Sequence, residues 1–309
     1  MSDFHELIVL TSPPASGKTY WVSKLSAAQP TIEILVIAPL RALADECRKL
    51  WGKSIIIMTP EEWNRKKVFS KIVIFDEFHL YFYWGDTFRP VMWEVFYEIS
   101  LHANQTFLLT ATLSEEMKQQ VGFFSTQFDS ILWLNYGNQI LKNKPHRYIK
   151  APSKNWIINQ LETELPRTGV KLIFCKYRQE VFLYEKKLSQ LGYSCIRCIG
   201  GESKYMAQKI NLNPNPDFII STTVLSHGVN LPEIKKIYFL YKINNLDFWI
   251  QMVARGGRRG GQFEVFSLDY PEGLKWHACW NFMIILWLSL KQALSPLSIF
   301  VMQSRKSGR

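Results

Sequence analysis

The sequence has few cysteines and lacks a long apolar run. Five of its 309 residues are cysteine, an odd number spread along the chain, which excludes a small secreted domain held by disulfides. The longest apolar stretch, residues 282–288, is far shorter than the roughly 20 residues of a membrane-spanning helix. The first residues also lack a basic segment followed by an apolar one, the pattern of a secretion signal. We therefore expect an intracellular, cytoplasmic protein without a membrane span.

Acidic residues are also scarce relative to basic ones. The chain has 37 Lys and Arg against 26 Asp and Glu, a formal net charge of +11, and 47% of its residues are hydrophobic. This composition excludes a disordered chain and is typical of a folded protein that binds a polyanion. A basic surface without any such partner is the alternative, and composition alone does not choose between them.

Short apolar runs alternate with helical segments in both halves of the chain, which predicts two α/β domains with parallel sheets. A polar passage with glycine and proline, residues 135–145, interrupts this alternation and marks a domain boundary. The predicted units are residues 1–141, residues 142–272, and an apolar helix with a basic tail at residues 273–309. Because this helix is apolar on nearly all sides, we expect either the second domain or a protein partner to cover it at residues 276–290.

The predicted strands and helices of the two domains have the following ranges. The strands of the first domain are 7–10, 32–37, 55–58, 72–75, 107–109 and 131–134, with helices at 40–50 and 91–101. The strands of the second domain are 170–175, 193–196, 218–221, 236–240 and 263–267, with a helix at 179–191.

Residues 12–19 read Ser-Pro-Pro-Ala-Ser-Gly-Lys-Thr and lie between a predicted strand and a helical segment. Their ending is that of a phosphate-binding loop, in which backbone N–H groups and a helix N-terminus point at the phosphates of a nucleotide. Lys18 would add a positive charge beside the β- and γ-phosphates, and the Thr19 hydroxyl would bind Mg²⁺. The sequence therefore predicts an ATP site that includes Ser16, Gly17, Lys18 and Thr19.

The apolar strand 72–75 is followed directly by Asp76, Glu77 and His79. Ligands of parallel α/β sheets bind at the carboxyl ends of the strands, where these side chains would lie. Asp76 would hold Mg²⁺, and Glu77 would orient or deprotonate the attacking water. A solvated acidic loop is the alternative, but a phosphate-binding loop precedes it in the same sheet.

Six further segments follow in an order known from one group of enzymes, and with these motifs the chain resembles a superfamily 2 helicase of the DExH-box kind. Their wording is most similar to the superkiller-like and archaeal repair helicase branch, here reduced to the two-domain motor core. That resemblance implies two tandem RecA-like domains with a short C-terminal helical extension. In the family, residues 12–15 are usually Ala-Pro-Thr-Gly. The segments are 38–46 (motif Ia), 59–61 (Ib), 109–113 (III), 172–178 (IV), 221–232 (V) and 251–260 (VI).

The resemblance also implies roles for single residues at the ATP site. Arg255 and Arg258 would reach the γ-phosphate from the second domain, as arginine fingers whose planar, permanently charged forks suit phosphate oxygens. A basic nucleic-acid patch is the alternative reading of these arginines. Gly228 and Gln251 would also contact the nucleotide. Residues that would link the ATP site to the nucleic acid are His79, Thr110 and Thr112.

On the nucleic-acid side, the resemblance implies contacts to the phosphates of one strand by Arg41, Thr59, Arg178 and Thr222. Such contacts position a strand without reading its sequence. The prediction is a helicase that uses ATP and Mg²⁺ to translocate on single strands or at a junction with duplex, 3′ to 5′ and on DNA rather than RNA, because of the repair members. A partner-dependent ATPase clamp without unwinding activity of its own is the alternative, and a binder without catalysis conflicts with the intact catalytic residues.

Overall fold

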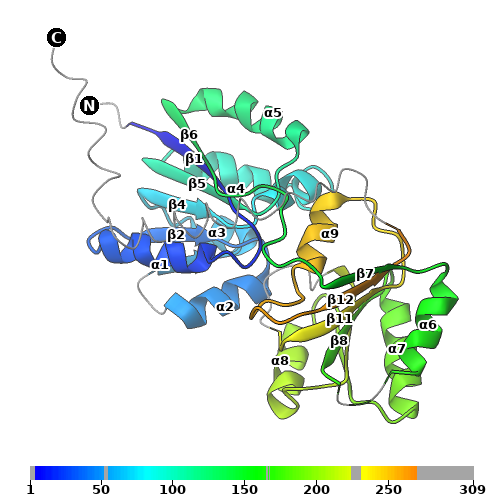
Figure 1. Ribbon diagram of the computed structural model, residues 1–309. Coiled ribbons are helices and arrows are strands. Elements are labelled where there is room, and N and C mark those ends of the chain that lie inside the picture. The colour runs from blue at the N-terminus through cyan, green and yellow to red at the C-terminus, as the bar shows by residue number, and fades with distance from the viewer. Residues whose placement is uncertain (1–3, 52–54, 165, 167, 224–230, 270–309) are drawn as a thin grey trace.

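The chain folds into two α/β domains, each built on a parallel sheet (Figure 1). A computed structural model describes residues 4–51, 55–164, 166, 168–223 and 231–269. The predicted C-terminal helix and Gly228 lie outside the described residues. The predicted fold class, two parallel-sheet α/β domains, is confirmed.

The sheet of the first domain has the order β3-β2-β4-β5-β1-β6, with every neighbouring pair parallel. This order brings the carboxyl ends of β1 and β4, which carry the phosphate-binding loop and the acidic motif, to one edge of the sheet. The elements are β1 (Glu6–Thr11), α1 (Lys18–Ala28), β2 (Ile34–Ile37), α2 (Arg41–Trp51), β3 (Ile55–Met58), α3 (Pro60–Lys66), β4 (Ile72–Phe75), the π-helix η1 (Tyr81–Gly85), α4 (Val91–Ser100), β5 (Gln105–Thr110), α5 (Glu115–Phe124), η2 (Ser125–Gln127) and β6 (Ser130–Asn135).

The sheet of the second domain has the order β7-β12-β11-β8-β10-β9 and is also parallel throughout. Its strands end toward the first domain, so that α9 lies against the first domain (Figure 1). The elements are β7 (Arg147–Lys150), α6 (Lys154–Glu162), β8 (Val170–Phe174), α7 (Arg178–Gln190), β9 (Cys195–Cys198), α8 (Ser203–Leu212), β10 (Phe218–Ser221), β11 (Ile234–Phe239), α9 (Leu246–Val253) and β12 (Glu264–Ser267).

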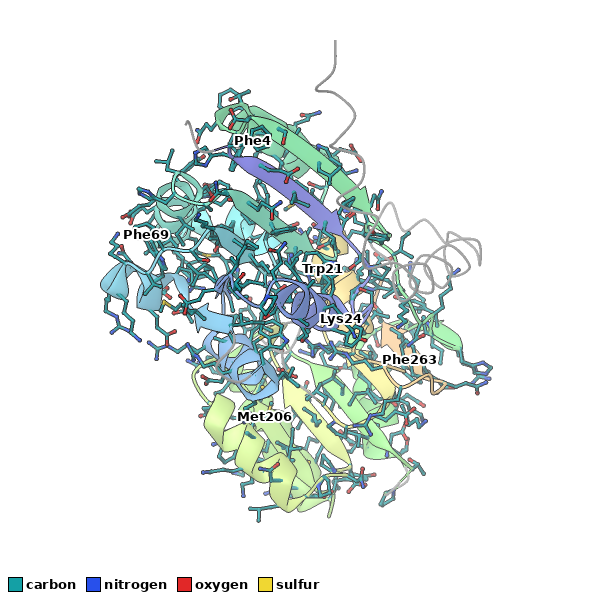
Figure 2. The ribbon with its side chains drawn as sticks, turned by 90° about the vertical axis from the view of Figure 1, so that its left-hand side faces the viewer. Phe4, Trp21, Lys24, Phe69, Met206 and Phe263 are labelled. Carbon is teal, nitrogen blue, oxygen red and sulfur yellow. The ribbon has the colours of Figure 1, made fainter. Side chains whose placement is uncertain are left out.

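Both sheets are covered by helices on their two faces, which explains why most strands are continuous apolar runs. In β2, Leu35 packs in the cluster with α3, α4 and α5, whereas Val36 packs in the cluster with α1 and α2. In β8, Leu172 faces α8 and α9, whereas Ile173 faces α6 and α7. Figure 2 shows the side chains of both domains, including Trp21 of α1, which packs on the first sheet.

The predicted strands match the observed ones to within two residues at each end, including 193–196, which lies at Cys195–Cys198. The strand β7 was not predicted. β7 follows a proline and has the mixed sequence Arg-Tyr-Ile-Lys, because it is an edge strand that is half-exposed. Among the described helices, none is long and apolar enough to cross a membrane.

Candidate ATP site between the two domains

The phosphate-binding loop connects β1 to α1. Gly17 has a φ of +102°, and α1 begins without a side-chain cap, whereas α3, α5, α6 and α9 each have one. The first N–H groups of α1 therefore remain available to an acceptor outside the helix, as phosphate binding requires. Lys18 Nζ donates to the carbonyl oxygen of Ser12 at 3.2 Å and lies over the loop. Ala15 has a φ of +59°, in the left-handed region that favours glycine.

The two carboxylates follow β4, as predicted. Glu77 also has a positive φ, +46°, and its backbone N–H donates to Asp76 Oδ1 at 2.9 Å. Burial and the charge of Glu77 raise the pKa of Asp76, while Lys18 opposes this shift. Glu77 Oε2 is buried without a hydrogen-bond partner in the described part of the chain. The raised pKa of Asp76 and the unpaired oxygen of Glu77 favour the binding of a cation, which would lie between these carboxylates and the phosphates of a nucleotide.

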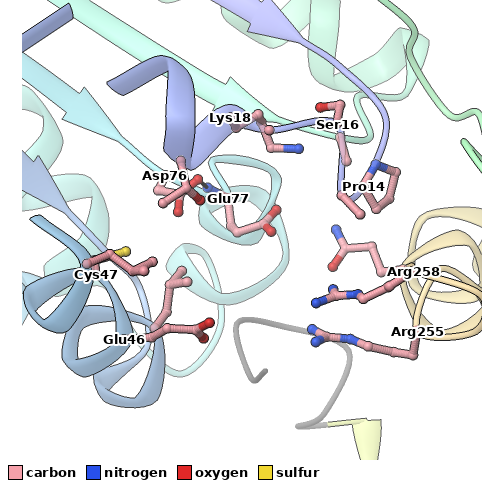
Figure 3. Close-up of a pocket in the computed structure, with 16 residues that line it drawn as sticks. Pro14, Ser16, Lys18, Glu46, Cys47, Asp76, Glu77, Arg255 and Arg258 are labelled. Carbon is pink, nitrogen blue, oxygen red and sulfur yellow. Dashed lines mark hydrogen bonds between the residues drawn. The ribbon is translucent and has the colours of Figure 1, made fainter. Parts of the chain in front are cut away.

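Two arginines of the second domain face these groups across a pocket (Figure 3). Arg255 is 2% exposed, and Arg258 lies three residues further along the chain. Burial, and then the charge of Arg258, lower the pKa of Arg255. The "phosphate pocket", as we name it, includes the predicted residues Ser16, Gly17, Lys18, Thr19, Asp76, Glu77, Gln251, Arg255 and Arg258.

The charges around this pocket fit a nucleotide with Mg²⁺. An anion would relieve the repulsion between the two arginines, and burial lowers the pKa of Lys18 as well. A bound cation would lower the raised pKa of Asp76, and the Thr19 hydroxyl is a suitable second ligand for it. Opposite charges are thus arranged for a ligand that carries both signs, as the Mg²⁺ complex of ATP does.

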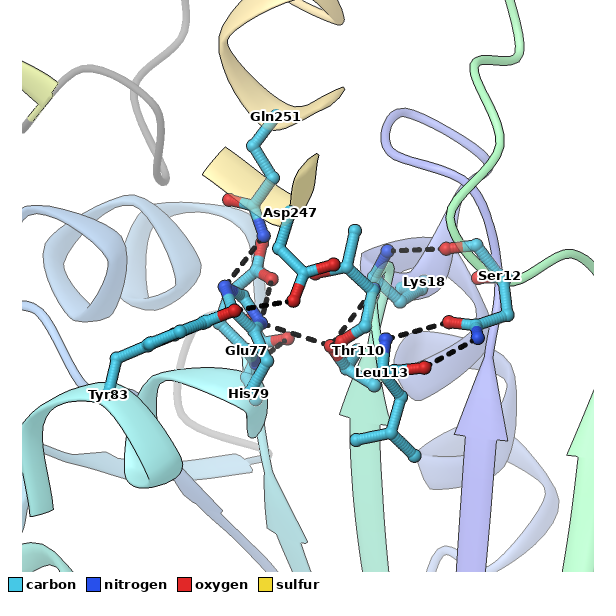
Figure 4. Close-up of polar contacts among 12 residues, drawn as sticks. Ser12, Lys18, Glu77, His79, Tyr83, Thr110, Leu113, Asp247 and Gln251 are labelled. Atoms are coloured by element: carbon cyan, nitrogen blue, oxygen red, sulfur yellow. Dashed lines mark hydrogen bonds and ion pairs between the residues drawn. The ribbon is translucent and has the colours of Figure 1, made fainter. Parts of the chain in front are cut away.

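A chain of hydrogen bonds joins the domains beside the phosphate pocket (Figure 4). Gln251 Nε2 lies 2.7 Å from His79 Nε2, and His79 Nδ1 lies 3.0 Å from Thr110 Oγ1, which also bonds to the carbonyl oxygen of Thr112 at 2.8 Å. Burial lowers the pKa of His79 to about 3, so the ring is neutral. Because the Gln251 amide must donate, His79 accepts at Nε2 and donates from Nδ1. The structure therefore brings together the three residues expected to link the ATP site to the nucleic acid, and joins them to Gln251 of the second domain.

The predicted nucleic-acid residues follow four strands. Arg41 is exposed at the start of α2, Arg178 is exposed at the start of α7, and Thr222 follows β10. Arg178 also donates to the carbonyl oxygen of Gly200. Thr59 differs from the expectation, because it is 1% exposed and its hydroxyl accepts from Glu62 N at 3.3 Å. A capping box therefore occupies the Thr59 hydroxyl, which is withdrawn from a strand at the surface.

Some residues of the interdomain contact escaped the sequence analysis. Glu46 of α2 lies in the phosphate pocket, and Asp247 lies one turn before Gln251 on α9, on the same side of the helix. That spacing is the signal that would have found Asp247. Tyr83 lies in an aromatic run after the acidic motif, residues 78–84, and the sequence carries no signal that separates it from the core residue Tyr81.

Comparisons with known proteins agree with this geometry. Residues 45–120 match the family described as DEAD/DEAH box helicase, and residues 154–260 match the helicase conserved C-terminal domain. The curated relative "DEAD-box ATP-dependent RNA helicase 35B" from Oryza sativa subsp. japonica is 24% identical over 163 residues, 50% of this chain. The matched stretch spans 26% of that relative, about a quarter of its length.

Solved structures show the same fold. Dbp5 of S. cerevisiae bound to RNA and ADP BeF3 has a TM-score of 0.67 and 16% identity, with 94% of this chain and 84% of that one covered. A Dbp5 variant bound to Gle1 and IP6 has a TM-score of 0.63 and 16% identity, with coverages of 94% and 82%. The curated relative is named a DEAD-box RNA helicase, so the expected superkiller-like branch and its preference for DNA are not supported. The chain carries the two-domain core of a superfamily 2 helicase.

Proposed function

We propose that this protein is an ATP-dependent RNA helicase of the DEAD-box type, which hydrolyses ATP between its two domains and remodels RNA. The observation that carries the proposal is the phosphate pocket, in which Lys18, Asp76 and Glu77 face Arg255 and Arg258 of the other domain. Because each domain supplies only part of this set, hydrolysis requires that the domains lie together.

The residues of the phosphate pocket have different roles in phosphoryl transfer. The N-terminus of α1 and Lys18 bind the β- and γ-phosphates, and Thr19 and Asp76 hold the metal. Mg²⁺, when bound, neutralises charge that develops on the phosphate oxygens. Glu77 orients the attacking water and takes its proton, while Arg255 and Arg258 stabilise the charge on the transferred group.

The neutral His79 chain supports a link between hydrolysis and the strand-binding side. Gln251 belongs to the phosphate pocket and also bonds to His79, which in turn bonds to Thr110. A change in the position of α9 therefore reaches β5 through two hydrogen bonds, without the desolvation cost of moving a charged imidazole.

RNA is the proposed nucleic acid because the matched relative is named an RNA helicase and the similar Dbp5 structure contains RNA. The exposed Arg41 and Arg178 would bind phosphates of one strand, and both lie at the carboxyl ends of strands in their own sheets. We expect weak sequence preference, and affinity that falls steeply with salt.

The central test is the steady-state ATPase rate of Glu77→Gln with single-stranded RNA, single-stranded DNA and duplex. Removing the carboxylate should lower the RNA-stimulated kcat by about 10²- to 10⁴-fold, because the water loses its general base. Glu94→Gln, an exposed position on α4, is the matched control and should retain the wild-type rate.

Unchanged turnover in Glu77→Gln would refute the mechanism, and equal or stronger stimulation by DNA would refute the choice of RNA. Strand displacement by the isolated chain tests the alternative of a partner-dependent ATPase clamp. Robust unwinding without any partner removes that alternative, whereas RNA-stimulated ATPase without unwinding favours it.

A further inference from the structure

A second contact between the domains lies beside the phosphate pocket and forms around the π-helix η1. Tyr83 donates from its hydroxyl to Asp247 Oδ2 at 2.6 Å, and its ring lies 4.9 Å from that of Phe248. Asn245 Nδ2 donates to the same hydroxyl at 2.9 Å, and Gln139 Nε2 donates to Asp247 Oδ1 at 2.8 Å. We call Tyr83, Gln139, Asn245 and Asp247 the interdomain clamp; Tyr83 and Asp247 are drawn in Figure 4.

The clamp is built around a buried charge. Asp247 is 2% exposed, yet both of its carboxylate oxygens receive hydrogen bonds, one from the first domain and one from the segment between the sheets. Burial and the bond to Asp247 raise the pKa of Tyr83, so the phenol remains a donor at neutral pH. A buried carboxylate without donors is costly, so these bonds stabilise one arrangement of the domains. When the domains separate, water must replace both donors.

The same short segment of chain continues into the strand-binding side of the first domain. Arg89, which follows η1, donates from Nη1 to the carbonyl oxygen of Pro39 at 2.6 Å and from Nη2 to Glu61 Oε1 at 2.7 Å. Its guanidinium lies 5.8 Å from the ring centroid of Trp84, the residue after Tyr83. Pro39 lies two residues before Arg41, in motif Ia, and Glu61 belongs to motif Ib. One segment, residues 83–89, thus contacts the second domain at one end and two strand-binding motifs at the other.

We propose that the interdomain clamp couples closure of the two domains to RNA binding, with Tyr83 and Arg89 as positioning residues that hold motifs Ia and Ib in the closed arrangement. The inference rests on the proposed function and adds a second coupling route, which runs beside the His79 chain and uses different hydrogen bonds. In this route neither residue touches ATP, and both act through the geometry of residues 83–89.

The test measures how strongly a nucleotide promotes RNA binding. The dissociation constant of a labelled single-stranded RNA is determined for the full chain, alone and with a non-hydrolysable ATP analogue. The coupling factor is the dissociation constant without the analogue divided by the dissociation constant with it. Tyr83→Phe removes only the hydroxyl and should lower the coupling factor about tenfold, because Asp247 loses a donor in the closed state alone. The affinity for RNA without nucleotide should stay at the wild-type value.

The matched control is Tyr97→Phe, which removes a hydroxyl from an exposed tyrosine of α4 and should retain the full coupling factor. Arg89→Lys keeps the charge but loses the planar fork that reaches both Pro39 and Glu61, so it should also lower the coupling factor. The kinetic counterpart is a rise in the apparent KM for ATP and RNA in Tyr83→Phe, with kcat unchanged at saturation, since saturating ligands hold the domains closed.

The outcomes separate the clamp from the proposed function. A wild-type coupling factor above one with the same factor in Tyr83→Phe overturns the clamp and leaves the proposed function intact. A fall in kcat or in RNA affinity without nucleotide, at an unchanged coupling factor, indicates a purely structural tyrosine and also overturns the clamp. A wild-type chain with neither RNA-stimulated ATPase nor coupling overturns both proposals.

Discussion

At the phosphate pocket, the charged groups of the two domains face one another across a cavity, whereas at the interdomain clamp polar groups of the two domains bond directly. Lys18 Nζ bonds to a carbonyl oxygen of its own loop, and Glu77 Oε2 and Gln251 Oε1 are buried without hydrogen-bond partners among the described residues. Both carboxylate oxygens of Asp247, in contrast, receive donors. The difference separates a region that awaits a ligand from one that is complete without it.

This comparison has an energetic consequence. Charges held for a ligand destabilise the free protein, because their burial is not compensated until the ligand binds. Polar groups that satisfy each other stabilise it, because removing one leaves its partner buried and unpaired. Substitutions in the phosphate pocket should therefore leave stability unchanged or raise it and should impair ATP hydrolysis. Substitutions of groups that satisfy each other should instead lower stability.

Among the substitutions that test this comparison, the largest effect is expected for Lys18→Gln in the phosphate pocket. Loss of the charge beside the phosphates should lower kcat/KM for ATP by about 10²- to 10³-fold. The unfolding free energy of the free protein should stay the same or rise, because burial lowers the pKa of Lys18 and so disfavours its charged form. The measurements are steady-state ATPase and denaturant unfolding.

The control for this substitution is Lys24→Gln, an exposed lysine on α1 that should leave both quantities unchanged. A marked loss of stability in Lys18→Gln would break the comparison, since the pocket would then support the fold rather than await a ligand.

A smaller effect, opposite in sign for stability, is expected for His79→Phe. The change removes both ring nitrogens and leaves the buried Gln251 amide without its acceptor, while the Thr110 hydroxyl keeps its bonds to Thr112, so the unfolding free energy should fall by about 1–3 kcal/mol at pH 7. His146→Phe, at an exposed histidine, is the control.

The effect of His79→Phe should also depend on pH. In the folded protein the pKa of His79 is about 3, against an ordinary value of 6.5, so the unfolded chain binds more protons between these values. The contribution of His79 is therefore complete above about pH 6.5 and is lost as the pH falls toward 3. The stability difference between wild type and His79→Phe should shrink on going from pH 7 to pH 5, and a constant difference would contradict a neutral buried ring.

The sequence predicted most residues of the phosphate pocket but not the interdomain clamp, for a physical reason. The pocket residues follow strands of a parallel sheet, so a local pattern such as Ile72–Phe75 before Asp76 places them at one edge. The clamp joins Tyr83 and Asp247, which lie 164 positions apart, and nothing local to either residue states which surfaces of the two domains meet. Thr59 shows the converse, because the motif gave it a contact to the strand while the local capping signature, Thr59 followed by Pro60 and Glu62, indicates that its hydroxyl caps a helix.

The smallest expected effect concerns the backbone of the phosphate-binding loop, where Ala15 stands at a position that is glycine in the family and has a φ of +59°. Ala15→Gly removes the clash of Cβ in the left-handed region, worth about 1–2 kcal/mol, but gives the unfolded chain more freedom, worth about 0.4–1 kcal/mol. The net result should be a gain of about 0.5–1 kcal/mol in unfolding free energy, measured with denaturant. Ala207→Gly, at an exposed position inside α8 where alanine is favoured, should instead lose about 1 kcal/mol. If both substitutions destabilise the protein equally, the backbone at Ala15 is not strained. The lower stability of the phosphate pocket would then arise from its buried charges and not from its backbone.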